Sequence, residues 1–494
     1  IEFYKKMIDK SYYYVDKTLM IKDLLDKGGE VNLFTRPRRF GKTLTLTMLK
    51  TFFECEIDRD GNVVDNSHYF REMKIWREGE RYQKEQGQYP VIFLSLKSAK
   101  QPNYKMAYHV LRDTIIREFV RHRYVLEGVC LVDAQKEKFR QLMGCKGEEG
   151  DYATSLQFLS ECLSAWHGKN VVILLDEYDV PLENAHFQGF YPEMIGFLRS
   201  FFESALKTND NLEFAVVTGC LRISRESIFT GLNNLKEVSV LTRDYAEYFG
   251  FTEEEVKEML KVYEIEQKME EARRWYDGYR FGDMEVYNPW SIINYVETAV
   301  SDIHAFPRPY WSNTSSNSII RELVETADPV MKLDVERLAD GGTVEVEVHE
   351  DITYDDIHSS QNNLWNFLFF TGYLKKISER FAGQNIYLEM AIPNQEVLYV
   401  YRRTVMEWFE QQVRKADFSG FYRALAEKDC PAIEQELNRQ LLETISFYDY
   451  AENYYHGFLA GLLRQHPKYA VRSNRESGNG RPDLVIYSPS VRGL

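Results

Sequence analysis

Short apolar segments alternate with helical segments along the first half of the chain. Runs of about five apolar residues, the length of a buried strand, occur at 31–35, 91–96, 171–175, 214–218 and 238–241. Apolar residues at helical spacing lie between them, at 44–53, 104–124, 152–166 and 190–207. This alternation predicts an α/β fold with a mainly parallel sheet. Because right-handed crossovers bring the carboxyl ends of such strands to one edge, we expect any ligand site at that edge.

The pattern changes near residue 245. Helices are predicted at 252–274 and 397–463, and short strands at 344–348, 385–388, 469–472 and 484–487, the last two flanking a glycine-rich turn. We therefore expect three domains. Residues 1–245 form the α/β domain, residues 246–395 a mainly helical lid or winged-helix-like linking domain, and residues 396–494 the first part of a small α/β unit.

Composition narrows the class of protein. A chain of 494 residues with 44% hydrophobic and 28% charged residues is typical of a globular protein with two or three cores. Its apolar runs are far shorter than the roughly 20 residues of a membrane helix, and it opens on Ile1 with a charged segment, so we expect a cytoplasmic protein without membrane association. Six scattered cysteines without a Cys-x-x-Cys spacing indicate neither a zinc site nor a disulfide framework. The net charge of −15 argues against nucleic-acid binding through the whole surface.

A glycine, a lysine and a threonine lie in succession at the first strand-to-helix junction. At such a junction, backbone N–H groups and the helix N-terminus attract phosphate, the lysine reaches the β/γ oxygens and the hydroxyl serves Mg²⁺. The motif differs from the usual phosphate loop at its first position, where arginine replaces glycine. A solvated basic turn is the alternative interpretation. The predicted nucleotide-binding residues are Arg36, Pro37, Arg38, Arg39, Phe40, Gly41, Lys42, Thr43 and Leu44.

A second element supports a site for ATP and Mg²⁺. The strand at 171–175 is followed directly by Asp176 and Glu177. P-loop enzymes need one acid here for the Mg²⁺ shell and another to activate the attacking water. We therefore assign Asp176, together with Thr43, to the metal and Glu177 to catalysis. Asp179, which lies two residues before a proline, is interpreted as a helix cap.

The next strand adds catalytic candidates. A strand and helix beginning at 91–96 separate the phosphate loop from the acidic strand, as in P-loop ATPases that insert an extra strand between the two. Thr218, at the end of the following strand, is the candidate that orients the water, and an ordinary strand-end threonine is the alternative. Arg222 and Arg225 follow; they are candidates for stabilising phosphate charge, or else surface arginines.

Five short segments of the chain form a specific combination of residues. They are Tyr14-Val15-Asp16-Lys17-Thr18, Arg36-Pro37-Arg38-Arg39-Phe40-Gly41-Lys42-Thr43, Leu175-Asp176-Glu177-Tyr178-Asp179, Thr218-Gly219-Cys220-Leu221-Arg222-Ile223 and Leu232-Asn233-Asn234-Leu235. Together they resemble the AAA-ATPase-like proteins of gut and anaerobic bacteria, and the resemblance covers nearly the whole chain. It implies that arginine at position 36 is a normal feature of this form of phosphate loop. It also implies that Asp16 and Lys17 lie near the bound nucleotide.

Members of this family commonly end in a nuclease-like domain of the PD-(D/E)xK type. Residues 452–459 and 473–483 resemble its beginning, with Glu452, Glu476 and Asp483 as remnants of its metal site. Such a site needs a Glu-x-Lys on the strand after its aspartate, but residues 484–494 contain neither an acid nor a lysine. We therefore expect an incomplete nuclease-like unit that does not cut DNA or RNA.

Three functions are compatible with these motifs. The first is ATP hydrolysis used as a switch or motor, the second a nucleotide-gated interaction protein without turnover, and the third the ATPase part of a nuclease acting on nucleic acid. The presence of both Asp176 and Glu177 favours hydrolysis. The sequence does not choose between nucleic acid and protein as the partner, and it leaves homo-oligomerisation open.

Overall fold

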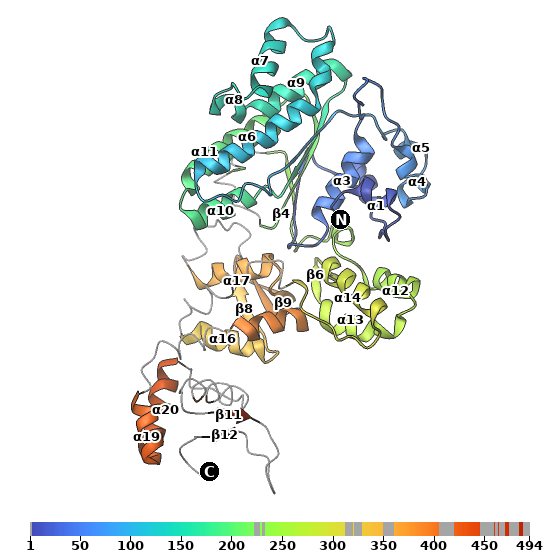
Figure 1. Ribbon diagram of the computed structural model, residues 1–494. Helices are drawn as coiled ribbons and strands as arrows, with labels where there is room; N and C mark the ends of the chain where they lie inside the picture. Colours follow the sequence, from blue (N-terminus) through green and yellow to red (C-terminus); the bar gives the residue numbers. More distant parts are fainter. Residues whose placement is uncertain are drawn as a thin grey trace. The chain divides into compact units, whose positions relative to one another are not determined.

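The computed structural model divides into two compact units. The first unit comprises Ile1–Trp311 and Glu345–Gln395, and the second comprises Ser312–Val344 and Glu396–Leu494. The first unit contains the large sheet (Figure 1). The described residues are 2–221, 228–229, 233–311, 320, 329–348, 360–404, 419–444, 459, 463, 470–473 and 484–487.

Five parallel strands form the centre of the first unit, in the order β2-β3-β4-β1-β5. Every residue of β1 and β3 is buried, as expected for a parallel sheet covered on both faces. The order places β4 between the strand that precedes the predicted phosphate loop and the strand that ends in the acids. This sheet confirms the predicted α/β fold. The strands are β1 (Val31–Thr35), β2 (Val91–Ser95), β3 (Val171–Asp176), β4 (Leu212–Gly219) and β5 (Leu235–Val238).

Helices cover both faces of this sheet (Figure 1). One face is covered by α3 (Lys42–Phe53), with α1 (Tyr4–Asp9) packed on it. The other is covered by α6 (Tyr104–Arg121), α9 (Ser155–His167) and α11 (Tyr191–Leu206). Further helical segments here are α2 (Leu19–Lys27), η1 (Ser67–Tyr69), α4 (Lys74–Arg77), α5 (Glu80–Gln83), η2 (Arg123–Glu127), α7 (Asp133–Met143), α8 (Glu149–Ala153) and α10 (Val180–Gln188).

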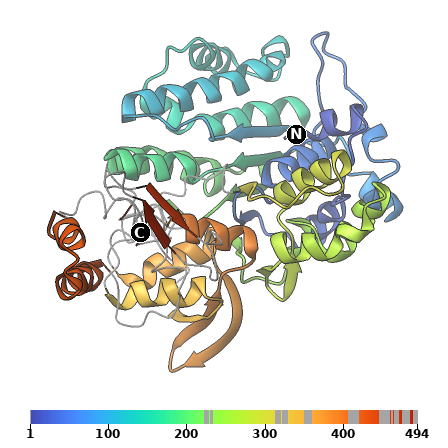
Figure 2. The same ribbon diagram turned by 60° about the horizontal axis from the view of Figure 1, so that its bottom comes forward.

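The rest of the first unit combines short helices with small antiparallel sheets. A three-stranded sheet has the order β8-β10-β9, and Figure 2 shows β9 and β10 as a long hairpin. A second hairpin pairs β6 with β7. The elements are η3 (Ala246–Tyr248), α12 (Glu253–Val262), η4 (Glu266–Lys268), α13 (Met269–Tyr276), β6 (Tyr279–Phe281), β7 (Met284–Val286), α14 (Pro289–Ser301), β8 (Val344–Glu347), α17 (Gln361–Phe370), β9 (Lys375–Ala382) and β10 (Asn385–Ala391).

Several elements differ from the sequence prediction. The fifth strand was expected at 238–241 but lies at Leu235–Val238, because Ser239 and Thr242 close a turn through two hydrogen bonds of 3.1 Å. The hairpin β6–β7 and strand β9 were not predicted. β9 contains few core residues, since most of its side chains are exposed, and such a strand carries no periodic apolar signal.

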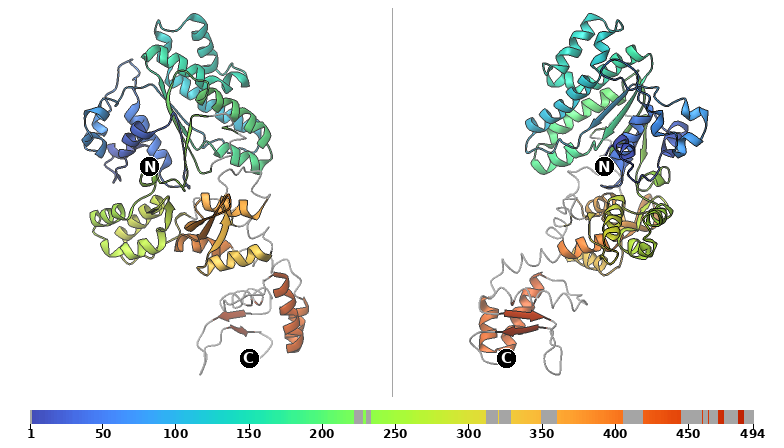
Figure 3. Two further views of the ribbon diagram at one scale, coloured as in Figure 1. Left: turned by 180° about the vertical axis from the view of Figure 1, so that it is seen from behind. Right: turned by 45° about the vertical axis from the view of Figure 1, so that its right-hand side comes forward.

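The second unit is mainly helical among its described residues. It contains α16 (Pro329–Ala339), α19 (Ser419–Glu427), α20 (Cys430–Thr444) and an antiparallel pair formed by β11 (Ala470–Ser473) and β12 (Leu484–Tyr487). Figure 3 shows the two strands beside α19 and α20. Phe421 and Leu463 form a small apolar core, against which Val471 and Ile486 of the strands pack. The two predicted strands therefore form and pair with one another.

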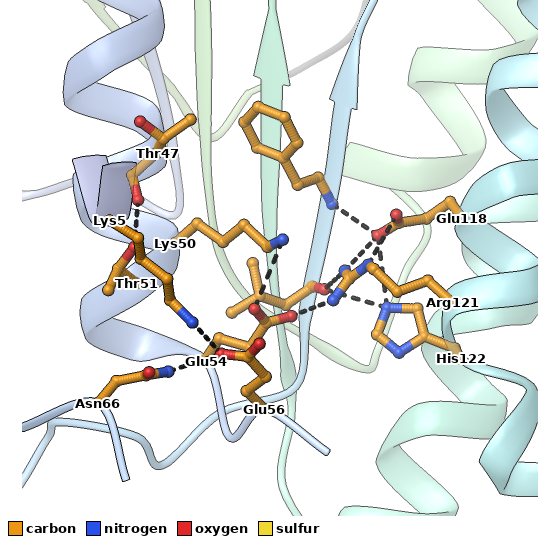
Figure 4. Close-up of polar contacts among 12 residues, drawn as sticks. Lys5, Thr47, Lys50, Thr51, Glu54, Glu56, Asn66, Glu118, Arg121 and His122 are labelled. Atoms are coloured by element: carbon orange, nitrogen blue, oxygen red, sulfur yellow. Dashed lines mark hydrogen bonds and ion pairs between the residues drawn. The ribbon is translucent and has the colours of Figure 1, made fainter. Parts of the chain in front are cut away.

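A buried ion cluster joins the end of α3 to α6 and β2 (Figure 4). Arg121 pairs with Glu54 and Glu118, and its Nε donates to Oε2 of Glu118 at 3.0 Å. The other oxygen of Glu118 accepts a hydrogen bond from the backbone N–H of Phe93 at 2.8 Å. Removing one member of such a buried cluster typically costs about 3–5 kcal/mol. The cluster therefore fixes one end of α3, while the other end begins the predicted phosphate site.

Candidate functional site

The junction of β1 and α3 has the backbone of an anion-binding loop. Residues 36–41 connect the two elements, and Gly41 is the N-cap of α3 with a φ of 84°. A Cβ on Gly41 would meet nothing within 4 Å, so the left-handed backbone, and not crowding, is what requires glycine here. Because the N-cap has no side chain, its position leaves the first N–H groups of α3 open to a ligand, which is the usual site for phosphate.

Three hydroxyl groups converge on the carboxylate of Asp176. Oδ2 accepts from the hydroxyl of Thr43 at 2.8 Å and from that of Ser95 at 3.3 Å, and Oδ1 accepts from the hydroxyl of Thr218 at 2.9 Å. Asp176 is fully buried, and burial, followed by the charge of Glu177, raises the pKa of its carboxyl group. The parallel register explains the convergence, since Ser95 pairs with Asp176 in β2 and β3. The structure therefore brings the predicted metal residues and Thr218 together.

Glu177 follows β3 in an unusual backbone conformation. Its φ is 51°, in the left-handed region that costs a non-glycine residue about 1–3 kcal/mol. Its carbonyl accepts from the N–H of Val180 at 3.2 Å, at the start of α10. Its charge also raises the pKa of Asp176 and of Cys220. Glu177 therefore lies at the carboxyl edge of the sheet, beside the buried aspartate.

The loop lysine is turned inward. Nζ of Lys42 donates to the carbonyls of Arg36 and Pro37, at 2.9 Å each, and lies 3.5 Å from Sγ of Cys220. Only 5% of Lys42 is exposed. The ammonium group therefore lies inside the curve of the loop, and the carbonyls of that loop hold it.

The side chain of Arg36 attaches the loop to neighbouring elements. It is fully buried, and Nη1 donates to the carbonyls of Thr35 and Val238 at 2.9 Å each. The guanidinium carbon lies 5.2 Å and 4.9 Å from the ring centres of Phe249 and Phe281, within the range of cation–π attraction. Burial lowers its pKa to about 9, so it stays charged at neutral pH. The backbone of Arg36 belongs to the loop, but its side chain anchors that loop to β5 and β6.

Other loop side chains also pack against later parts of the first unit. Phe40 makes edge and tilted contacts with Tyr279 and Phe281, with ring centres 5.0 Å and 5.2 Å apart. A Cβ on Gly372, whose φ is 91°, would lie 2.9 Å from Cβ of Pro37. The loop is thus held between the sheet and the hairpin β6–β7.

The remaining loop residues lie closer to solvent. Arg38 makes an ion pair with Glu183 of α10, in which the single nitrogen Nη2 lies 2.6 Å and 2.5 Å from the two carboxylate oxygens. The guanidinium of Arg39 lies 4.5 Å from the ring centre of Trp290. Leu44 is half-buried in the first turn of α3. Glu183 carries no motif that the sequence prediction uses, so only its position reveals this contact.

Asp16 and Lys17 have protein partners. Asp16 accepts from the hydroxyl of Thr18 at 2.6 Å and from the N–H of Lys74 at 2.7 Å. Nζ of Lys17, which is 9% exposed, contacts both oxygens of Glu255 at 2.7 Å and 2.6 Å. These contacts hold the N-terminal segment to α4 and α12. The nucleotide contact implied for both residues stays a prediction.

Asp179 has a role that the sequence did not reveal. It is the N-cap residue of α10, as predicted, but its side chain does not cap that helix. Instead, Oδ2 accepts from the N–H groups of Cys220 and Leu221 at 2.8 Å and 3.1 Å. A Cβ on Gly219 would lie 2.8 Å from Oδ1, so glycine permits this close approach. Burial raises the pKa of Asp179 to about 6.

Some predicted site residues lie outside the described residues. They are Arg222, Arg225, Glu452, Glu476 and Asp483. Among the residues that the structure describes, no group of three or more His, Cys, Asp or Glu side chains is arranged to hold a metal ion. Within that same part of the chain, no helix combines the length and the apolar character needed to cross a membrane.

The first half of the chain matches a known family. Residues 1–229 match the family model described as a predicted AAA-ATPase. That match includes the predicted phosphate loop, the strand β3 that ends in Asp176 and the strand β4 that contains Thr218. The chain is also 24% identical over 493 residues to the "Uncharacterized protein in vnfD 5'region" of Azotobacter chroococcum mcd 1, covering 96% of this chain and 83% of that protein. No solved structure matches the chain.

Proposed function

We propose that the chain binds ATP with Mg²⁺ at the loop between β1 and α3 and hydrolyses it as a switch or motor. The observation that carries this proposal is the buried carboxylate of Asp176, which accepts from the hydroxyls of Thr43 at 2.8 Å and Thr218 at 2.9 Å. A phosphate loop, an acid and a polar strand end thus meet at one edge of a parallel sheet. The match of residues 1–229 to the predicted AAA-ATPase family supports the same conclusion.

The residues at this edge fit a magnesium ion. Mg²⁺ prefers oxygen ligands and usually takes one or two carboxylates besides water and phosphate. The hydroxyl of Thr43 and the carboxylate of Asp176 would hold it, because both are oxygen donors and already face one another. When bound, Mg²⁺ would neutralise charge on the β- and γ-phosphates. The raised pKa of Asp176 is consistent with a buried acid that is stabilised by a cation.

Lys42 and Glu177 complete the proposed site. The ammonium group of Lys42 would exchange the loop carbonyls for phosphate oxygens, which are stronger partners because they are charged. Glu177 would accept the proton of the attacking water, and Thr218 would help to orient that water. Arg222 and Arg225 are proposed to stabilise phosphate charge. We also propose that domain boundaries lie at residues 245 and 395. Residues 246–395 would then form a linking domain that responds to nucleotide binding at the loop.

Nucleotide binding is tested with the Lys42→Ala variant. The parent should bind a fluorescent ATP analogue in the presence of Mg²⁺, and Lys42→Ala should bind it much more weakly, because the β/γ contact is lost. Lys27→Ala is the matched control, since that lysine lies on α2 with 59% of its side chain exposed. Equal affinities of parent and Lys42→Ala would refute the site.

Turnover is tested with Glu177→Gln and Asp176→Asn. Glu177→Gln should keep ATP affinity but lose phosphate release, because an amide holds water without accepting its proton. Asp176→Asn should weaken the Mg²⁺-dependent part of binding. A control is Glu203→Gln, which alters an exposed pair with Lys207 on α11. Phosphate release by Glu177→Gln at the parental rate would place the base elsewhere, and no phosphate release by the parent would favour a protein that binds nucleotide without turnover.

A further inference from the structure

The ion pair of Arg38 with Glu183 connects the phosphate loop to α10. Nη2 of Arg38 lies 2.6 Å from Oε1 and 2.5 Å from Oε2 of Glu183. The two side chains are 27% and 16% exposed, so the pair is largely shielded from water. Nζ of Lys100 lies 3.9 Å from the same carboxylate. Glu183 is therefore a direct, partly buried counter-charge of a loop arginine.

Arg38 and Lys42 belong to one loop, and the charges of both act on the buried thiol of Cys220. Both cations lower the pKa of the buried Cys220 thiol, whose pKa rises to about 11 mainly through burial. Nζ of Lys42 is 3.5 Å from that thiol. Because a phosphate-loop lysine serves the β- and γ-phosphates, Arg38 is placed to reach the same end of the nucleotide.

The helix that carries Glu183 begins just after the proposed catalytic base. α10 begins at Val180, directly after the segment that holds Glu177, the proposed base for the water that attacks the γ-phosphate. Glu183 also raises the pKa of Asp179, which binds the backbone after β4. The partner of Arg38 thus lies on the helix that follows the acidic end of β3, and its charge acts on Asp179 of the same segment.

We propose that Arg38 exchanges Glu183 for the terminal phosphate of a bound triphosphate, so that Glu183 sets the preference between ATP and ADP. This inference rests on the proposed function. A triphosphate offers Arg38 a doubly charged bidentate partner, which competes with the carboxylate. A diphosphate lacks this terminal phosphate and would leave the ion pair intact. Exchange would also release α10 from the loop, and the acidic strand end would thereby respond to the γ-phosphate.

The test compares ATP and ADP affinity in a double-mutant cycle. The proteins are the parent, Glu183→Gln, Arg38→Ala and the double variant, titrated with fluorescent ATP and ADP analogues in Mg²⁺. Glu183→Gln should bind the ATP analogue about fivefold more tightly, the size expected for losing a partly exposed competing ion pair, with ADP affinity within about twofold of the parent. In the Arg38→Ala background the Glu183 substitution should change neither affinity.

The outcomes separate this inference from the proposed function. Equal changes in ATP and ADP affinity, or a Glu183→Gln effect that persists without Arg38, would overturn the exchange while leaving the ATP site in place. Absence of ATP binding by the parent would refute the proposed function itself. Glu203→Gln should leave the ATP-to-ADP ratio at the parental value. Glu183→Ala provides a second removal of the carboxylate, and thermal unfolding of each variant verifies that it is folded.

Discussion

Replacing Arg36 by glycine would restore the usual first residue of a phosphate loop. We expect this change to lower the free energy of unfolding, because the buried side chain of Arg36 holds the loop in place. Its Nη1 binds the carbonyls of Thr35 and Val238, and its guanidinium lies against Phe249 and Phe281. Glycine would leave both carbonyls without this donor. It would also remove the charged side chain through which the loop is attached to them.

The expected loss of unfolding free energy in Arg36→Gly is the balance of several opposing contributions. Two hydrogen bonds from a charged donor contribute about 3–6 kcal/mol, and the contacts with the two rings add about 2 kcal/mol. Burial of the charge opposes them: the pKa is lowered to about 9, which corresponds to a cost of about 5 kcal/mol. The space left behind and the extra backbone freedom of glycine cost about 1–3 kcal/mol. The expected net loss of unfolding free energy is therefore about 1–6 kcal/mol, which lowers the unfolding midpoint by several degrees.

The assay is thermal unfolding followed by circular dichroism, together with ATP affinity. Arg36→Gly should unfold at a lower temperature and should bind ATP more weakly, because the loop loses its support. Arg71→Gly is the matched control, since the side chain of Arg71 is 60% exposed. An unchanged midpoint and an unchanged ATP affinity for Arg36→Gly would refute the anchoring role.

Three further predictions concern the contacts of Thr218, Asp179 and Lys17. Thr218→Val should lower ATP hydrolysis about tenfold or more, because Oδ1 of Asp176 loses its hydroxyl partner; Thr218→Ser should restore the rate, and a fully active valine variant would contradict this role. Asp179 has a pKa raised to about 6, so the folded protein keeps a proton that the unfolded chain releases, and stability falls as pH rises from about 4 to 6. The free energy of unfolding of Asp179→Asn relative to the parent should therefore rise over this range and level off above it, with a total change of at most about 3 kcal/mol; a constant difference measured across the range would disprove the linkage. Lys17→Ala should reduce stability by about 3 kcal/mol by leaving Glu255 without its buried partner, as measured by thermal unfolding, whereas a loss of ATP affinity with unchanged stability would support the nucleotide contact instead.

The fold of the first unit is readable from local pattern because its strands are buried on both faces. Such strands appear as continuous apolar runs, and β1 to β4 lie close to the predicted ranges. β9 does not follow this rule, since its side chains from Glu379 to Phe381 are exposed. Its strand conformation arises from pairing with β10, a partner that no local periodicity specifies. The short hairpin β6–β7 was missed for the same reason.

The sequence by itself determined those strands, helices and junctions that depend on neighbouring residues in the chain. A strand, a Gly41-Lys42-Thr43 junction and a helix are contiguous, and Asp176 and Glu177 directly end a strand. Parallel alternation then places both segments at one edge of a sheet. This much follows from the order of residues, because backbone conformation and strand direction depend on near neighbours.

Only the tertiary structure decided which side chains meet. Arg36 binds a carbonyl 202 residues away, Lys17 pairs with a carboxylate 238 residues away, and Arg38 pairs with one 145 residues away. A charged residue in a sequence has many possible partners, and the choice among them depends on burial and on the packing of distant elements. For this reason Glu183, and the attachment of Asp179 to the end of β4, become visible only when the chain is folded.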